Sequence, residues 1–238
     1  MSTLARATLQ ARRDPLRLVI FDCDGVLIDS ERIADRVFAE ELANVGWPIT
    51  PAEVHARFLG MRTQEMPPVI EAMIGRPLPE GWAMHVAQRL VLVLGEEVEL
   101  MPGAIEALDA ADALGLDWRI ASNSGPRQLA AKFARTQLTE RVAGRVLSAN
   151  TIVAAGGRSK PAPDIFLAAA NTAACEPTAC LVIEDSILGV RGAVAAGMQC
   201  LGFDPEGDGS HLTTEGAVPF HSMFDVPDLL RIAHRAVA

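Results

Sequence analysis

The chain has 238 residues, of which 50% are hydrophobic, enough to bury a sizeable core in one large domain or in a core with one insertion. The formal net charge of −9 excludes a non-specific polyanion partner, because nucleic-acid binding needs a basic surface that displaces counterions. No stretch reaches the roughly 18 apolar residues of a membrane span, so we expect no membrane partner. The four cysteines have no metal-site spacing and lie beside or within apolar runs, which indicates reduced thiols and a cytoplasmic protein.

The chain starts with an Arg-bearing segment, residues 1 to 13, that contains Ser and Thr but no acids. This composition superficially suits an organelle transit segment, but we interpret residues 1–15 as an N-terminal tail. The first strand is expected at residues 18–21, because four consecutive apolar residues bounded by charge indicate a strand that is buried on both faces.

Two acids, Asp22 and Asp24, follow that strand and are separated by one residue. Side chains two apart on extended backbone point the same way, and ligands of open α/β sheets bind at the carboxyl ends of the strands. Two carboxylates so close repel each other, so the pair needs a cation or a shared proton. We therefore expect a carboxylate nucleophile, an acid–base partner and a hard metal such as Mg²⁺; the alternative is a strand that ends in a polar turn.

The next segment, residues 30 to 100, predicts only helices and interrupts a chain that otherwise alternates strands and helices. Its apolar residues recur at helical spacing, and Pro51 and Pro79 each open a helix. Between these two helices, Pro67–Pro68 is expected to interrupt the helical material. The pattern predicts an inserted helical domain.

Strands and helices alternate again from residue 101 onward. Strands separated by helices of this length indicate right-handed crossovers and a parallel sheet, which makes the fold class α/β. The expected domains are a core of residues 16–29 and 101–238 and a helical cap of residues 30–100. The strands after the insertion are expected at residues 118–121, 146–147, 180–183 and 198–203, with a possible short strand in the tail that starts at residue 217.

Three further strand ends carry polar groups. Ser122 and Asn123 stand before an expected helix start, which is typical either of an anion site or of an ordinary helix cap. Lys160, one of only two lysines, lies in a stiff Pro-rich loop, where its ammonium could hold a phosphoryl oxygen or be solvated. Glu184 and Asp185 end another apolar run and suit either an oxygen shell around Mg²⁺ or the first turn of a helix.

Together, the four strand ends supply a nucleophile, a hydroxyl, an ammonium and a metal-binding acid pair, a complete set for phosphoryl transfer. The chain resembles the haloacid dehalogenase superfamily of phosphotransferases, in the branch that holds β-phosphoglucomutase and the sugar-phosphate and phosphoglycolate phosphatases. The resemblance implies a Rossmann-like parallel sheet core with an all-helical cap inserted after the first motif. It spans about residues 16 to 203 and rests on the runs Phe21-Asp22-Cys23-Asp24-Gly25-Val26-Leu27-Ile28-Asp29-Ser30, Ala121-Ser122-Asn123-Ser124, Lys160-Pro161-Ala162-Pro163-Asp164-Ile165-Phe166 and Ile183-Glu184-Asp185-Ser186.

The resemblance also implies a role for each matched residue. Asp22 would attack phosphorus to form an aspartyl-phosphate, while Asp24 would protonate the leaving oxygen and then deprotonate the attacking water. The Mg²⁺ ligands would be the Asp22 carboxylate, the Asp24 backbone carbonyl and Asp185, with Glu184 close by or bound through water. The transferring phosphoryl group would be held by Ser122, the N–H of Asn123 and Lys160.

The cap is expected to supply contacts to the leaving group. Arg62 and Thr63 lie in a break between expected helices, and the family arrangement turns that loop toward the core. With Glu31, these residues are the candidate substrate-binding residues of the cap. The alternative for Arg62 is a solvated loop position.

Departures from relatives narrow the expected reaction. Residues 30 to 100 contain no lysine, which excludes the phosphonoacetaldehyde hydrolases, because these need a cap lysine for a Schiff base. The presence of Asp24 argues against haloacid dehalogenases, which lack the second acid and the metal. The mutase branch carries a His where this chain has Ala34 and an Arg at the position that matches Thr63, so hydrolysis is favoured over phosphoryl return to a sugar.

We therefore expect a Mg²⁺-dependent phosphatase that acts on a small phosphorylated metabolite, such as a sugar phosphate or a phosphoglycolate-like compound. A β-phosphoglucomutase-like sugar phosphomutase is the alternative. A non-catalytic phospho-acceptor or scaffold module is more remote. The protein is expected to be a monomer or a weak homodimer.

Overall fold

The computed structural model describes Leu9 and residues 14–235, so most of the tail expected over residues 1–15 lies outside the described residues. Strand β1, Leu18–Phe21, is fully buried, as its uninterrupted apolar run predicts. Leu18 and Ile20 face one hydrophobic cluster, whereas Val19 and Phe21 face the other. Alternate residues of one strand therefore reach both layers of the core, which is typical of a sheet covered by helices on both faces.

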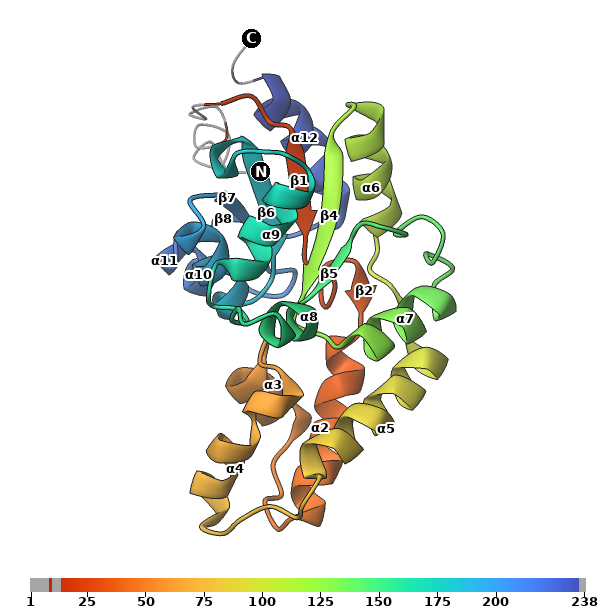
Figure 1. The fold of residues 1–238 in the computed structure, drawn as a ribbon, viewed down its shortest axis with the longest axis vertical. Coiled ribbons are helices and arrows are strands. Elements are labelled where there is room, and N and C mark those ends of the chain that lie inside the picture. The colour runs from red at the N-terminus through yellow and green to blue at the C-terminus, as the bar shows by residue number, and fades with distance from the viewer. Residues whose placement is uncertain (1–8, 10–13, 236–238) are drawn as a thin grey trace.

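The main sheet has six strands in the order β5-β4-β1-β6-β7-β8, and all of its neighbouring strands pair in parallel (Figure 1). Strand β1 lies between β4 and β6, so the chain crosses to both sides of its first strand. Ligand sites form at the carboxyl ends of strands where the order reverses in this way. The predicted α/β class with a Rossmann-like parallel sheet is confirmed. The other strands are β4 (Asp117–Ser122), β5 (Val146–Ser148), β6 (Cys180–Glu184), β7 (Gln199–Phe203) and β8 (Val218–Phe220).

Helices cover both faces of the sheet (Figure 1). One hydrophobic cluster holds residues of α6 and α12, and the other holds residues of α9 and α10. A helix not expected from the sequence, α8, follows β5, where Ser148 accepts a hydrogen bond from the backbone N–H of Asn150. The core helices are α6 (Ala104–Ala113), α7 (Pro126–Arg135), α8 (Ala149–Ala154), α9 (Asp164–Thr172), α10 (Ile187–Ala195), α11 (Ser210–Thr214) and α12 (Val226–Arg235).

Four helices form a separate layer at the end of the molecule where Asp22 follows β1 (Figure 1). We call them the cap helices. Their apolar stripes pack on one another, with Ile33 and Val37 of α2 and Val86 and Leu90 of α5 in one buried cluster. The cap helices are α2 (Glu31–Asn44), α3 (Pro51–Phe58), α4 (Pro67–Ile74) and α5 (Trp82–Glu97).

Two expectations about this layer are wrong. Residues 30 to 100 are not purely helical, because β3 (Glu99–Leu100) pairs antiparallel with β2 (Ile28–Asp29) in a short ribbon where the chain enters and leaves the cap helices. Pro67 and Pro68 do not interrupt a helix but begin α4. The first helical turn tolerates proline, because its N–H groups have no intrahelical partner. No helix among the described residues is both long and apolar enough to cross a bilayer.

Candidate active site

The carboxyl ends of three adjacent strands bring the predicted polar groups into one pocket under the cap helices. Asp22 follows β1, Ser122 ends β4 and Glu184 ends β6. The backbone N–H of Asp22 donates to the carbonyl oxygen of Ile183 at 2.9 Å, which keeps the strand ends aligned one residue beyond β1. The pocket is lined by Asp22, Asp24 and Asp185 from these ends together with Lys160 and Asn123 from the following loops.

Lys160 is the buried cation of this pocket, with 3% of its side chain exposed. Its Nζ donates to Asp22 Oδ1 at 2.5 Å, to the carbonyl oxygen of Ala121 at 2.8 Å and to Glu184 Oε1. Burial lowers the pKa of Lys160, but the carboxylates of Asp22 and Glu184 outweigh it and raise the pKa above the ordinary lysine value. The ammonium is therefore a fixed positive charge beside Asp22.

Asp22 and Asp24 lie in different electrostatic environments. Burial raises the pKa of Asp22 to about 8, and Lys160 opposes that shift. Burial also penalises the Asp24 carboxylate, but the charge and hydrogen bond of Lys132, together with Ser30 and Ser124, lower its pKa to about 2. Ser30 donates to Asp24 Oδ1 at 2.5 Å, and Ser124 donates to Oδ2 at 2.9 Å. The two acids that follow one strand thus have separate partner sets, which separates their roles.

Lys132 is a site residue that lies outside the four sequence motifs. It lies near the end of α7, is 1% exposed, and pairs with Asp24 through Nζ, which also donates to Ser124 Oγ at 2.8 Å. Its neighbours in the sequence belong to no recognisable motif. The only signal was composition, since Lys132 and Lys160 are the only lysines of the chain and both form buried ion pairs in this pocket.

Three carboxylates, from Asp22, Glu184 and Asp185, lie with one oxygen of each within 4.8 Å of the others. Burial and the neighbouring Glu31 and Asp22 carboxylates raise the pKa of Asp185 well above its ordinary value. Buried carboxylates that repel one another and offer only oxygen ligands fit a hard divalent cation. The backbone also fits, because Gly25 has φ +70° and a Cβ there would lie 1.8 Å from Asp185 Oδ2.

The four predicted metal ligands are not equally well placed to bind a cation. The Asp24 side chain is held elsewhere, by hydroxyls and Lys132, so only its backbone carbonyl remains a candidate ligand. Glu184 is fully buried, and both of its oxygens are engaged, Oε1 by Lys160 and Oε2 by Ser186 Oγ at 3.0 Å. Asp22 and Asp185 are therefore the carboxylates best placed to face a cation, and Glu184 orients Lys160.

The predicted phosphoryl-binding residues of β4 and its loop lie at the same place. Ser122 is fully buried and donates to Asp24 Oδ2 at 3.1 Å, so its hydroxyl borders the acid pair. The Asn123 side chain donates through Nδ2 to the carbonyl oxygen of Gly60 at 2.7 Å and so ties the core to the loop between α3 and α4. Its backbone N–H remains the group proposed for the phosphoryl oxygen.

The predicted cap residues also line the pocket, but Arg62 is not a solvated loop residue. Its side chain is 9% exposed, with Nε and Nη2 at 3.0 and 2.6 Å from Asn150 Oδ1 and Nη1 at 3.0 Å from Glu65 Oε1. Arg62 therefore bridges the cap helices and α8. Thr63 is buried in the pocket wall beside it, in the short 3₁₀ helix Thr63–Glu65.

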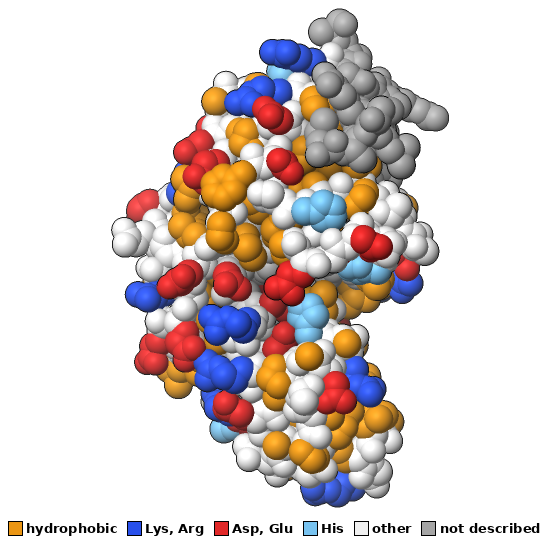
Figure 2. Space-filling view, turned by 180° about the vertical axis from the view of Figure 1, so that it is seen from behind, with side chains coloured by type: hydrophobic (Ala, Val, Ile, Leu, Met, Phe, Trp, Pro, Cys, Tyr) orange, Lys and Arg blue, Asp and Glu red, His pale blue; other side chains and the backbone are white. Residues whose placement is uncertain are grey.

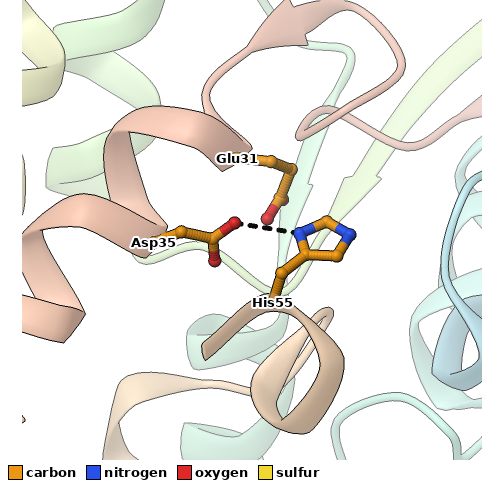
Figure 3. A group of neighbouring side chains, drawn as sticks. All are labelled: Glu31, Asp35 and His55. Carbon is orange, nitrogen blue, oxygen red and sulfur yellow. Dashed lines mark hydrogen bonds and ion pairs between the residues drawn. The ribbon is translucent and has the colours of Figure 1, made fainter. Parts of the chain in front are cut away.

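Glu31 lies at the start of α2 and forms a small cluster with Asp35 of the same helix and His55 of α3 (Figure 3). His55 Nδ1 and Asp35 Oδ2 are 2.9 Å apart. Burial, with the Asp24 and Asp35 carboxylates nearby, raises the pKa of Glu31 to about 8. Sequence reasoning found Glu31 but missed its two neighbours, because they meet only when α3 packs on α2.

The arrangement supplies the parts of a nucleophilic substitution at an anionic centre. Asp22 is a pocket-lining carboxylate beside a fixed ammonium, and Asp24 is a second acid held next to it by hydroxyls and Lys132. Figure 2 shows acidic side chains, with a histidine among them, where the molecule narrows between the sheet and the cap helices. A pocket with preplaced charges of both signs stabilises charge that develops during group transfer.

Comparisons with known proteins agree with this geometry. The family model described as "haloacid dehalogenase-like hydrolase" matches residues 16–197. The chain is 26% identical to the 6-phosphogluconate phosphatase of Escherichia coli K12 over 90% of its length and 94% of that protein. It is 32% identical to a probable pseudouridine-5'-phosphatase of Drosophila melanogaster, covering 76% of this chain and 78% of the relative.

A solved structure is similar over almost its whole length. The haloacid dehalogenase-like protein of unknown function from Agrobacterium tumefaciens has a TM-score of 0.77 and 33% sequence identity, covering 91% of this chain and 98% of that one. Its agreement extends through both the sheet and the cap helices, since so little of either chain is left out. The sequence, the fold and the pocket lead to one conclusion: this chain belongs to the haloacid dehalogenase-like hydrolases.

Proposed function

We propose that the protein is a Mg²⁺-dependent phosphatase that hydrolyses a small phosphomonoester, such as a sugar phosphate, through an aspartyl-phosphate on Asp22. The observation that carries the proposal is the division of partners between the two acids. Asp22 is paired with Lys160, whereas Asp24 is held by Lys132 and three hydroxyls. One carboxylate can therefore attack phosphorus while the other handles the proton.

In the first half-reaction, an Asp22 oxygen forms a bond to phosphorus as the ester P–O bond breaks. The anionic phosphoryl group of the bound substrate, placed beside Asp24, opposes the effect of Lys132 on the Asp24 pKa and favours the protonated acid. The leaving oxygen then takes the proton from Asp24, which is left ionised. Lys160 and the Ser122 hydroxyl neutralise and hold the phosphoryl oxygens during the transfer. The products are the free alcohol and phosphorylated Asp22.

In the second half-reaction, water attacks the phosphoryl group and the bond from phosphorus to Asp22 breaks. Asp24 takes a proton from that water, so it returns to its starting protonation state and inorganic phosphate is released. A Mg²⁺ ion held by Asp22, Asp185 and the Asp24 backbone carbonyl would supply the charge neutralisation that lets a carboxylate approach an anionic phosphoryl group.

Two further findings support hydrolysis of a phosphomonoester. The relatives from Escherichia coli and Drosophila melanogaster are both named as phosphatases. Ala34 and Thr63 line the pocket at the positions where the mutase branch carries His and Arg. No basic side chain stands at either position, which favours water over a sugar hydroxyl as the acceptor.

The test is phosphate release from p-nitrophenyl phosphate with and without Mg²⁺, for the wild type and for Asp22→Asn. We expect the variant to lose at least about 10³-fold in kcat/KM, because the amide cannot form the covalent intermediate. Asp109→Asn is the matched control, since Asp109 is an exposed acid on α6 that pairs with Arg141. Acid-quenched wild-type enzyme should carry one phosphoryl group on the peptide that contains Asp22.

Full activity of Asp22→Asn would refute the nucleophile assignment. Phosphate release that does not depend on a divalent cation would refute the metal assignment alone. Transfer to a sugar hydroxyl in preference to water would favour the mutase alternative. If the folded protein released no phosphate from any ester, the non-catalytic reading would replace the proposal.

A further inference from the structure

The pocket has two ends with opposite electrostatic character. At the core end, the carboxylates of Asp22 and Asp24 face the ammonium groups of Lys160 and Lys132. At the cap end, the wall carries Glu31 and Asp35 on α2. The transferring phosphoryl group belongs at the core end, so the leaving group must lie against α2 and the loop between α3 and α4.

Each cation that lines the pocket is already paired with a carboxylate. Lys160 binds Asp22 and Glu184, Lys132 binds Asp24, and Arg62 binds Glu65. Arg62 also gives two of its nitrogens to Asn150. Among the described lining residues, none therefore offers an unpaired positive charge to the leaving group.

The two carboxylates of the cap end have different partners. Asp35 is held by His55, and the pair keeps the Asp35 carboxylate directed toward Glu31 (Figure 3). The Glu31 side chain makes no hydrogen bond or ion pair with any described residue, although it is largely shielded from solvent. Glu31 lines the pocket, and its carboxyl oxygens are available to accept hydrogen bonds from a ligand donor in place of water.

The rest of the cap wall is mostly apolar, and the cation among its described lining residues, Arg62, is already paired, so it cannot offset these charges. A second anionic group on the substrate would meet the Asp35 carboxylate and no unpaired cation among the described lining residues, so like charges would repel and specificity would follow. Hydroxyl groups would instead donate hydrogen bonds to the carboxylate oxygens, and bonds to a charged acceptor are stronger than neutral ones. The apolar residues of this wall include Phe38, Val54, Phe58, Leu90 and Leu94.

We propose that Glu31 and Asp35 form a hydroxyl-binding wall that selects phosphomonoesters of an uncharged polyol and rejects those that carry a carboxylate or a second phosphate. This inference rests on the proposed phosphatase function and narrows its substrate class. It assigns Asp35 a substrate contact, with His55 as the residue that positions it.

The test uses pairs of phosphate esters that differ in charge at the end away from the phosphate. Glycerol 3-phosphate and 3-phosphoglycerate differ only by CH₂OH against carboxylate, and glucose 6-phosphate and 6-phosphogluconate form a second pair. For each compound, Ki is measured against p-nitrophenyl phosphate hydrolysis, and kcat/KM where the compound is turned over. We expect the wild type to favour the uncharged member of each pair by about tenfold or more.

The variants separate a local effect from the overall charge. Asp35→Asn should reduce the preference for the uncharged member about tenfold, because an amide does not repel an anion. Glu31→Gln should reduce it less, because the raised pKa of Glu31 leaves less negative charge to remove. The matched control is Glu40→Gln, which removes one charge from the same helix at an exposed site paired with Arg89. Its preference should equal that of the wild type.

The proposal is overturned if the wild type favours the charged members, treats the members equally or is inhibited by none of the four. It is also overturned if Glu31→Gln and Asp35→Asn leave the preference unchanged, or if Glu40→Gln changes it as much. Because p-nitrophenyl phosphate hydrolysis is the reporter, these outcomes leave the phosphatase assignment standing. Loss of that reporter in the wild type would instead overturn the phosphatase function and the inference together.

Discussion

The two ends of the pocket differ in how completely their charges are paired. At the core end, Lys160 has three acceptors and Asp24 has four donors, including Lys132. At the cap end, Glu31 has no partner among the described residues. At the core end, the charged groups are already paired with one another within the protein. At the cap end, the Glu31 carboxyl group is available to bind the ligand.

This difference separates reaction from recognition. Preplaced charges do not reorganise when charge shifts in the transition state, so a fully paired network suits the chemical step. An unpaired carboxylate gains most when the right donor arrives, so it suits discrimination among substrates. We expect substitutions at the core end to lower both stability and turnover, and substitutions at the cap end to change substrate preference.

The largest expected effect follows from Lys160→Met. The change leaves Asp22 and Glu184 buried without their shared cation, and breaking a buried ion pair on one side costs about 3–5 kcal/mol. Denaturant unfolding measures the free energy of unfolding, and p-nitrophenyl phosphate hydrolysis should be lost in parallel. A variant as stable as the wild type would show that the core end is not an interdependent network.

The matched variant at the cap end is Glu31→Gln. Burial has raised the pKa of Glu31 to about 8, so its ionised form is disfavoured in the fold. We therefore expect its free energy of unfolding to be unchanged or slightly higher than that of the wild type. A loss of unfolding free energy comparable to that of Lys160→Met would show that the two ends of the pocket do not differ in this way.

Lys132→Met removes the cation beside Asp24, and we expect its effect on activity to be smaller than that of Lys160→Met. If Lys132 positions the acid, kcat/KM should fall about 10²-fold for glycerol 3-phosphate, whose alkoxide needs a proton. It should fall much less for p-nitrophenyl phosphate, since that leaving group departs without one. A purely structural loss would lower both rates equally, and Lys132→Arg should recover part of the difference.

The smallest expected loss of stability concerns His55 and Asp35. Their hydrogen bond raises the pKa of His55 above its ordinary value, and burial opposes the shift. The folded state therefore holds the proton more tightly than the unfolded chain. This stabilisation is complete below about pH 6.5 and is lost as the pH rises through the folded pKa.

Asp35→Asn should thus destabilise the protein more at about pH 5.5 than at about pH 8.5, by a few tenths of a kcal/mol, because His55 is nearly half exposed. A proton NMR titration should show the His55 pKa returning toward its ordinary value in the variant, with His55→Gln used to assign the signal. A pKa that does not fall would mean that Asp35 is not its controlling partner.

The sequence predicts the strands that are buried at every position, and it predicts the polar residues at which those strands end. Strands β1 and β6 are uninterrupted apolar runs, and the groups after them converge because parallel strands end at one edge. That rule predicts the convergence of Asp22 and Asp185, whereas Lys160 lies in the loop after α8. It could not supply the ribbon of β2 and β3, because two-residue strands have no periodicity to detect.

The missed residues share a different cause. Lys132 lies within α7, where the sequence shows only a helix, and its partner Asp24 is more than a hundred residues away. His55 and Asp35 meet because two helices pack at one angle rather than another, and no local pattern encodes that contact. Side chains placed by the packing of helices are therefore harder to predict than side chains placed by the edge of a sheet.

Gly25 shows how an absent side chain can constrain a site. It carries no functional group, yet any Cβ at this position would overlap the Asp185 carboxylate, and the backbone there has a positive φ. A saturation-mutagenesis library would consequently rank position 25 among the least tolerant of the chain, beside the proposed catalytic residues. The cause would be steric, because the space beside Gly25 is filled by the Asp185 carboxylate and even the methyl group of alanine would not fit.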